Sequence, residues 1–80
     1  MMNREEIEQK VKEILADILD IDAKKIELNS DLVNDFGMDS FGAIEVVFAL
    51  KEQFKIDIPE EDLKNIKLVS EIVEYIKSHL

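Results

Sequence analysis

The sequence predicts an all-α fold, a small four-helix bundle in which three main helices and a short third helix surround one core. Apolar residues recur with helical spacing in three separate stretches. The 80 residues are 46% hydrophobic and include only 2 glycines and 1 proline, a composition that suits an ordered core. We therefore expect residues 1–80 to form a single domain of modest stability, with a long loop between the first two helices.

The first helix is expected to begin after Asn3 and to end near Leu19 or Ile21. Asn3 is a favoured N-cap residue, and Glu6, three positions later, completes the capping-box pattern. One helical stripe of apolar residues follows, comprising Ile7, Val11, Ile14, Leu15 and Ile18.

Residues 22–39 form a connection whose length is unusual in a small domain and often functional. Ile26 and Leu28 alternate with polar residues, but a lone strand has no partner, so we interpret them as loop residues packed into the core. Residues 30–33 are compatible with one capped helical turn, with Leu32 and Phe36 pointing inward. Gly37 can supply the positive φ of a sharp turn before the next helix.

The second helix is predicted to have Asp39 as its N-cap and Ser40 as its first residue. Its apolar stripe is wider than that of the first helix and comprises Ala43, Ile44, Val47, Phe48, Leu50 and Phe54. A wide stripe indicates either plain core or a helix that packs on several neighbours or lines a cavity. Gly42, in the first turn, costs up to about 1 kcal/mol relative to alanine and has no stability-based reason in the sequence.

Pro59 is predicted to be the first residue of the short third helix, because its ring fixes φ and it cannot continue the preceding helix. Leu63 and Ile66 are its expected inward residues. The last helix is expected to start near Leu68 or Val69, with the stripe Val69, Ile72, Val73, Ile76 and Leu80. His79 is interpreted as a frayed terminal residue with no partner for catalysis or metal binding.

The charge distribution constrains the partners. The net charge of −9 opposes binding to nucleic acids and to anionic membranes, because both require cations. Every charged residue from Ile26 to Leu50 is acidic, namely Glu27, Asp31, Asp35, Asp39 and Glu45. This acidic window is either a solubilising surface or a docking surface for basic partners. The absence of cysteine excludes disulfides and thiolate sites and fits a reducing compartment, and with no signal peptide or membrane-spanning stretch we expect a cytoplasmic protein.

Enzyme and metal-site readings fit the sequence poorly. A serine nucleophile needs a base, and the only histidine is His79. A calcium-loop register starting at Asp31 places Val33 at a ligand position, Phe36 where glycine is required and Gly42 where the bidentate glutamate belongs. We therefore expect neither catalytic residues nor a dedicated metal site.

The remaining interpretation is a module that holds a group for other proteins, with Ser40 as the attachment point. A hydroxyl at the first position of a helix is accessible. A phosphate on that oxygen would meet the free N–H groups and the positive end of the helix dipole.

Residues 35–41, DFGMDSF, resemble the motif of acyl carrier proteins, in which an Asp-Ser-Leu sequence carries 4′-phosphopantetheine on the serine. Residues 44–50, Phe54, residues 56–59 and residues 73–76 resemble the later parts of the same family at the expected spacing. The resemblance implies one acyl-carrier-type domain over residues 1–80. It also implies a 4′-phosphopantetheine arm, derived from coenzyme A and covalently bound to Ser40. That arm carries acyl groups as thioesters for fatty acid or related lipid or polyketide biosynthesis.

The resemblance also implies the partners of a monomeric carrier. They are a phosphopantetheinyl transferase and acyl-processing enzymes with basic docking patches, to which Asp39 and Glu45 offer carboxylates. Phe41 stands where the family usually has leucine, and Gly42 and Lys51 occupy positions that are often acidic. These departures favour a specialised carrier. A D-alanyl, aminoacyl or peptidyl carrier and an unmodified acidic helical adaptor are the alternatives.

Overall fold

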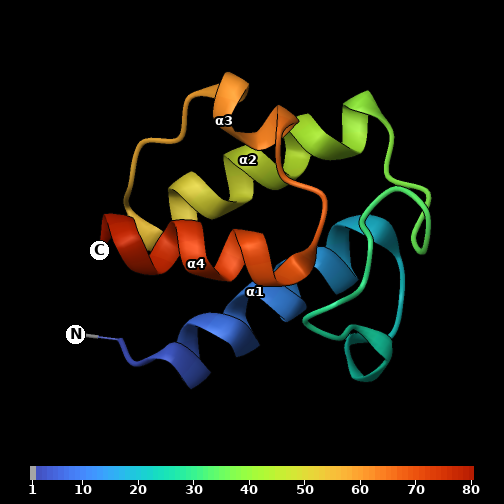
Figure 1. Ribbon diagram of the computed structural model, residues 1–80, viewed down its shortest axis with the longest axis horizontal. Coiled ribbons are helices and arrows are strands. Elements are labelled where there is room, and N and C mark those ends of the chain that lie inside the picture. Colours follow the sequence, from blue (N-terminus) through green and yellow to red (C-terminus); the bar gives the residue numbers. More distant parts are fainter. Residues whose placement is uncertain (1) are drawn as a thin grey trace.

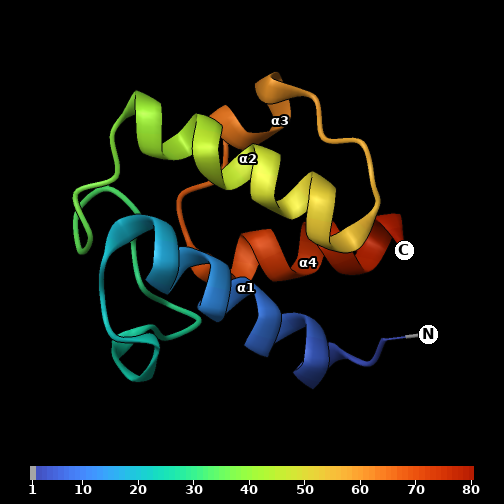
Figure 2. The same cartoon turned by 180° about the vertical axis from the view of Figure 1, so that it is seen from behind.

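The computed structural model describes residues 2–80, and the helices within this range confirm the predicted all-α bundle. The helices are α1 (Arg4–Leu19), α2 (Ser40–Phe54), α3 (Glu60–Lys64) and α4 (Val69–His79), with a 3-10 turn η1 (Ala23–Lys25) after α1. Helix α1 packs against both α2 and α4, and the short α3 lies beside α2 (Figures 1 and 2). Among the helices of this range, none is both long and apolar enough to cross a membrane.

The first helix forms as its capping residues predict. The Asn3 side chain accepts a hydrogen bond from the Glu6 N–H at 2.9 Å, and the Glu6 carboxylate accepts one from the Asn3 N–H at 3.2 Å. These two bonds satisfy N–H groups that the first turn of a helix leaves without intrahelical partners. The helix ends at Leu19, where Asp20 adopts a left-handed conformation with φ 56°.

The core collects the apolar residues that α1, α2 and α4 turn toward one another. Its fully buried members include Ile7, Val11, Leu15, Val46, Leu50, Val69, Ile72, Val73 and Ile76. The inward positions predicted for α1 and α4 are largely confirmed. Leu80 is the exception, because it follows the last residue of α4 and is 44% exposed.

The stripe predicted for α2 needs correction at two positions. Val46, which the prediction omitted, is fully buried, whereas Phe48 is 63% exposed. The buried residues Gly42, Val46, Leu50 and Phe54 recur every four positions and, together with Val47, form the core face of α2, while Ile44 is 43% exposed. Ile44 and Phe48 lie on an adjacent face, so an apolar side chain does not by itself identify the core here.

The connection between α1 and α2 runs through two short turns. Ile26 is buried and Leu28 is half-buried, which confirms them as loop residues that pack on the core. The capped turn predicted at residues 30–33 is displaced toward residues 32–36. Asp31 is the capping residue, because its carboxylate accepts hydrogen bonds from the N–H groups of Val33 and Asn34 at 3.0 and 2.8 Å.

The same loop is tied to the start of α4. The Leu32 N–H donates to the Lys67 carbonyl at 2.9 Å, and the Val69 N–H donates to the Ser30 carbonyl at 3.1 Å. The hydrogen bond from the Asn34 N–H lowers the pKa of Asp31 below its ordinary value. These bonds anchor the loop that leads into α2.

Two predictions for the C-terminal third need correction. Pro59 is the residue before α3, not its first residue, because its ψ of 135° is extended and the helix starts at Glu60. Ile66 therefore lies beyond the end of α3, although it still packs against the core. His79 is the last residue of α4, and its ring stacks on Tyr75 with centroids 4.1 Å apart.

Candidate prosthetic-group site at the start of α2

Ser40 is exposed at the first position of α2, where the sequence predicted it. Gly37 turns the chain before the helix with a φ of 67°, a conformation that glycine adopts without steric cost. Asp39 is the N-cap, and its carboxylate accepts a hydrogen bond from the Gly42 N–H at 2.8 Å. These residues fix where the helix begins and leave the Ser40 hydroxyl on the surface.

The structure supplies the reason for Gly42 that the sequence lacked. Gly42 is buried against the end of α1, and a Cβ atom there would lie 3.3 Å from Met38 Cγ and 3.5 Å from Leu19 Cδ2. It would also lie 3.4 Å from the Asp39 carboxylate oxygen that caps the helix. A side chain at this position would therefore press mainly on Met38 in the turn before α2, whereas its contact with Leu19 of α1 would be an ordinary one.

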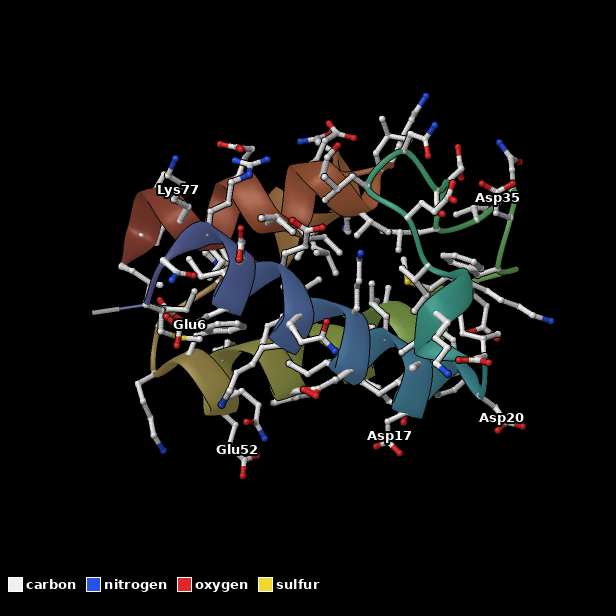
Figure 3. The ribbon with its side chains drawn as sticks, turned by 90° about the horizontal axis from the view of Figure 1, so that it is seen from below. Glu6, Asp17, Asp20, Asp35, Glu52 and Lys77 are labelled. Atoms are coloured by element: carbon white, nitrogen blue, oxygen red, sulfur yellow. The ribbon has the colours of Figure 1, made fainter. Side chains whose placement is uncertain are left out.

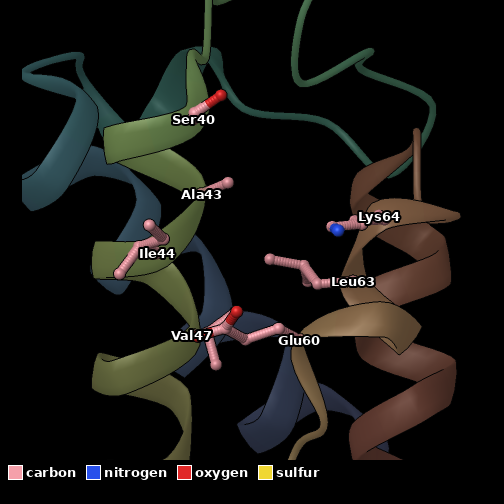
Figure 4. Close-up of a pocket in the computed structure, with 7 residues that line it drawn as sticks. All are labelled: Ser40, Ala43, Ile44, Val47, Glu60, Leu63 and Lys64. Carbon is pink, nitrogen blue, oxygen red and sulfur yellow. The ribbon is translucent and has the colours of Figure 1, made fainter.

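An apolar cleft opens beside Ser40, between α2 and α3 (Figure 4). Its volume is about 170 Å³. One wall consists of Ser40, Ala43, Ile44 and Val47 from α2, and the other consists of Glu60, Leu63 and Lys64 from α3. Figure 4 shows Leu63 extending from α3 toward α2. Of the two readings of the wide apolar stripe, the cavity-lining one applies to Ile44 and Val47.

Lys64 is a residue of this cleft that the sequence reasoning missed. It is exposed at the last position of α3 and lines the same cleft as Ser40, although 24 positions separate the two residues in the chain (64 minus 40). Its spacing of four from Glu60, with Leu63 as the inward residue, is the one local signal that could have placed it on this wall. The acidic window around Ser40 thus faces a cation from another helix.

Two aromatic residues of α2 remain on the surface. Phe41 is 80% exposed directly after Ser40, and Phe48 is 63% exposed. They are seven positions apart, so they lie on one side of the helix. Phe41 stands where the resembled family usually has leucine, and this position is on the surface.

Three acidic residues near Ser40, namely Asp31, Asp35 and Asp39, are engaged in local structure. Asp35 accepts a hydrogen bond from the Asp31 N–H at 2.7 Å, while Asp31 and Asp39 bind the backbone as described above. Within residues 2–80 there is no group of three or more histidine or acidic side chains arranged to hold a metal ion. Lys51, another departure from the family pattern, pairs with Asp57 at 3.4 Å.

The family model for the phosphopantetheine attachment site matches residues 9–76, and the chain therefore belongs to this family. The chain is 42% identical over 71 residues to an acyl carrier protein from Clostridium acetobutylicum, covering 89% of this chain and 92% of that protein. It is 40% identical over 70 residues to an acyl carrier protein from Clostridium perfringens, covering 88% of this chain and 92% of the relative.

A solved structure supports the same assignment. An acyl carrier protein from Mycobacterium tuberculosis superposes with a TM-score of 0.84 at 29% identity, over 90% of this chain and 96% of that one. The fold and the sequence relatives together establish the general function of an acyl carrier protein with a covalently attached phosphopantetheine group. Proteins of this family are carriers rather than catalysts.

The residues around the start of α2 fit such a group. A phosphate-linked arm needs an accessible hydroxyl, and Ser40 offers one. An apolar cargo needs an apolar surface, and Ile44, Val47 and Leu63 line the adjacent cleft. When bound, the group supplies a terminal thiol that holds acyl groups as thioesters, which this cysteine-free chain cannot do with its own side chains.

Proposed function

We propose that Ser40 is the attachment residue and that this carrier serves fatty acid biosynthesis or a related lipid or polyketide pathway. The observation that carries the proposal is the exposed hydroxyl of Ser40 at the first position of α2, on the rim of the apolar cleft. An acyl group held beside Ser40 can reach this cleft without crossing the core.

The local backbone favours a phosphate at this position. The Gly42 and Ala43 N–H groups donate to Asp39, at 2.8 and 2.9 Å, so they are already satisfied. The N–H groups of Ser40 and Phe41 are the earlier donors of the same turn, and the helix dipole places partial positive charge beside them. On modification, the Ser40 oxygen bonds to the phosphorus of coenzyme A that bears pantetheine. The bond from that phosphorus to the nucleotide phosphate breaks, and the hydroxyl proton leaves to the transferase or solvent.

The cleft suits the apolar part of an acyl chain. Ile44, Val47 and Leu63 present hydrocarbon to it, and Leu63 is buried among them. Removing a methylene group from water contributes about 0.8 kcal/mol. A short run of methylene groups in the cleft is therefore enough to hold a cargo against α2 and α3.

The partners we propose are a phosphopantetheinyl transferase and acyl-processing enzymes with basic docking patches. Asp39, the N-cap of α2, and Glu45, in its second turn, are both exposed, and no basic residue lies between Ile26 and Leu50. Complementary charge of this kind accelerates encounter and orients the partners.

The test is to incubate the apo-protein with coenzyme A and a broad-specificity transferase and to measure its intact mass. We expect the mass of the wild-type protein to increase by one phosphopantetheine group, and that of Ser40→Ala to stay unchanged. Ser78→Ala is the matched control, because Ser78 is also an exposed serine on a helix. A wild-type protein that gains no mass, or a gain that persists in Ser40→Ala, contradicts the proposal. The mass of the acyl group on protein isolated from its host then identifies the pathway.

A further inference from the structure

We propose that Lys64 binds the phosphodiester of the prosthetic group and holds the arm along the cleft between α2 and α3. Lys64 is a positioning residue in this role. The inference rests on the proposed attachment at Ser40, and it names a contact on the opposite wall of the same cleft.

The geometry brings Lys64 to the right side of the cleft. Ser40 and Lys64 both line the cavity of about 170 Å³, one from α2 and the other from α3. Figure 4 shows Lys64 on the α3 side of the cleft, between the levels of Ser40 and Leu63. A phosphate on the Ser40 oxygen would therefore lie at the mouth of the cleft that Lys64 also lines.

The charges near Ser40 make this contact distinctive. Modification replaces a neutral hydroxyl by a phosphodiester with one negative charge, in a stretch where Asp35, Asp39 and Glu45 are all acidic. No lysine or arginine occurs from Ile26 to Leu50, so a compensating cation must come from elsewhere in the fold. Lys64 is the basic residue that lines the cleft.

The ammonium of Lys64 is available for this purpose. The ion pairs formed within residues 2–80 are Arg4–Glu74, Lys12–Glu8 and Lys51–Asp57, and Lys64 takes part in none of them. The other basic side chains of α2 and its end are poorly placed, since Lys51 is paired and Lys55 follows the last residue of the helix. With a rise of about 1.5 Å per residue, Lys55 lies roughly 22 Å along the helix from Ser40, well beyond the Debye length of about 8 Å at physiological salt.

The experiment compares Lys64→Gln with Lys55→Gln, which removes the same charge at the far end of α2. Each protein is first loaded to completion with coenzyme A and a transferase, and its intact mass is checked. A protein that never gains the mass of phosphopantetheine speaks against attachment at Ser40. The two readouts that follow are measured on loaded protein, so they test only the contact between Lys64 and the phosphodiester. They are the ³¹P chemical shift of the phosphodiester and the difference in melting temperature between the loaded and the apo form.

We expect Lys64→Gln to move the ³¹P resonance and to lower the melting-temperature difference by about 1–8 °C, the range for one exposed ion pair in a domain of this size. Lys55→Gln should leave both unchanged, Lys64→Arg should restore both, and high salt should make wild type resemble Lys64→Gln. A ³¹P resonance or a melting-temperature difference that Lys64→Gln leaves unchanged overturns the proposal, as does an equal effect of Lys55→Gln. If Lys64 instead contacted the neutral amide groups of the arm, Lys64→Gln would leave the ³¹P resonance in place, and that result would contradict the proposal.

Discussion

Phe41 and Leu50 are both large apolar residues of α2, but they face opposite environments. Phe41 is 80% exposed and Leu50 is 1% exposed. The free energy gained by burial on folding is therefore large for Leu50 and small for Phe41. An exposed aromatic ring next to Ser40 is instead available to a partner protein, since aromatic residues often dominate binding at protein interfaces.

We expect Phe41→Ala to change the free energy of unfolding by less than about 0.5 kcal/mol, as is usual for surface substitutions. Leu50→Ala, the control in the same helix, should lower it by about 2–5 kcal/mol because it leaves a cavity in the core. Urea denaturation followed by circular dichroism measures both changes. Phe41→Leu should likewise leave stability intact but alter the relative kcat/KM values of partner enzymes that use the loaded carrier. A large loss of stability in Phe41→Ala would show that the ring belongs to the core.

At the scale of elements, α1 and α2 begin with equivalent caps but only one of them presents Ser40. Asn3 accepts from the Glu6 N–H at 2.9 Å, and Asp39 accepts from the Gly42 N–H at 2.8 Å. Loss of either cap should cost about 0.5–2 kcal/mol of unfolding free energy. The two caps differ in what they position, because only the cap at Asp39 fixes the turn that carries Ser40.

We therefore predict that Asn3→Ala and Asp39→Ala destabilise the fold by similar amounts, while only Asp39→Ala slows modification by the transferase. Fraying of the first turn of α2 would leave the Ser40 oxygen without a fixed position. Melting curves measure the stability change, and the rate of mass gain with coenzyme A measures the modification. Asp39→Asn separates the cap from the charge, because asparagine also caps helices well. If Asn3→Ala slowed modification as much as Asp39→Ala, general destabilisation would be the cause.

Helix α3, which forms one wall of the cleft, is tied to α4 by Tyr75. The Tyr75 hydroxyl donates a hydrogen bond to Asp62 at 2.7 Å. This hydrogen bond, together with partial burial and the negative charge of Asp62, raises the pKa of Tyr75 to about 12. The protonated hydroxyl is thus favoured in the folded state relative to the unfolded state.

The raised pKa predicts how Tyr75→Phe depends on pH. Below pH 10 the hydroxyl is protonated in both states, and wild type should be more stable than Tyr75→Phe by about 0.5–1.5 kcal/mol. As the pH rises from about 10 to about 12, the unfolded state loses the proton first, so this advantage declines and disappears above the folded-state value. Urea titrations of both proteins at several pH values measure the difference. A difference that stays constant through this range would show that the hydroxyl does not hold Asp62.

The same scale shows which parts of the fold could be predicted from the sequence. The starts of α1 and α2 were predicted because capping signals are local, that of α4 was placed from its apolar stripe, and Gly37 was predicted from its turn requirement. The core face of α2 was not, because Ile44 and Phe48 are as apolar as Val46 and helical periodicity cannot tell a cleft or surface stripe from a core stripe. Lys64 was missed because its place beside Ser40 depends on the packing of α3 against α2, and its spacing from Glu60 indicates only a shared face of α3.

At the scale of the whole molecule, negative charge is in excess, and nearly half of it is not balanced by basic residues. The chain has 19 acidic and 10 basic residues, and its net charge is −9. Figure 3 shows charged side chains such as Asp17, Asp35 and Glu52 extending outward from different sides of the bundle. Close packing of like charges destabilises the compact state through repulsion, most of all where basic residues are absent.

Screening this repulsion should stabilise the fold. Raising the salt concentration from about 10 mM to about 150 mM shortens the Debye length from about 30 Å to about 8 Å. The melting temperature should rise by about 4–8 °C for each kcal/mol of repulsion relieved. Glu45 lies in the acidic window, whereas Glu13 on α1 shares a surface groove with Lys10. Glu45→Gln should therefore reduce the salt dependence more than Glu13→Gln does.

Attachment of the prosthetic group should also change how strongly the melting temperature depends on salt. The phosphodiester adds one negative charge at the start of α2, inside the acidic window. In Lys64→Gln the loaded protein should therefore gain more from salt than the apo-protein does. In wild type the ammonium of Lys64 offsets part of this added repulsion, so the increase should be smaller. Melting curves of the apo and loaded forms of wild type and Lys64→Gln at both salt concentrations measure these four salt dependences.

For the two glutamate variants, equal salt dependences of Glu45→Gln and Glu13→Gln would mean that the repulsion is spread over the whole surface and not concentrated around Ser40.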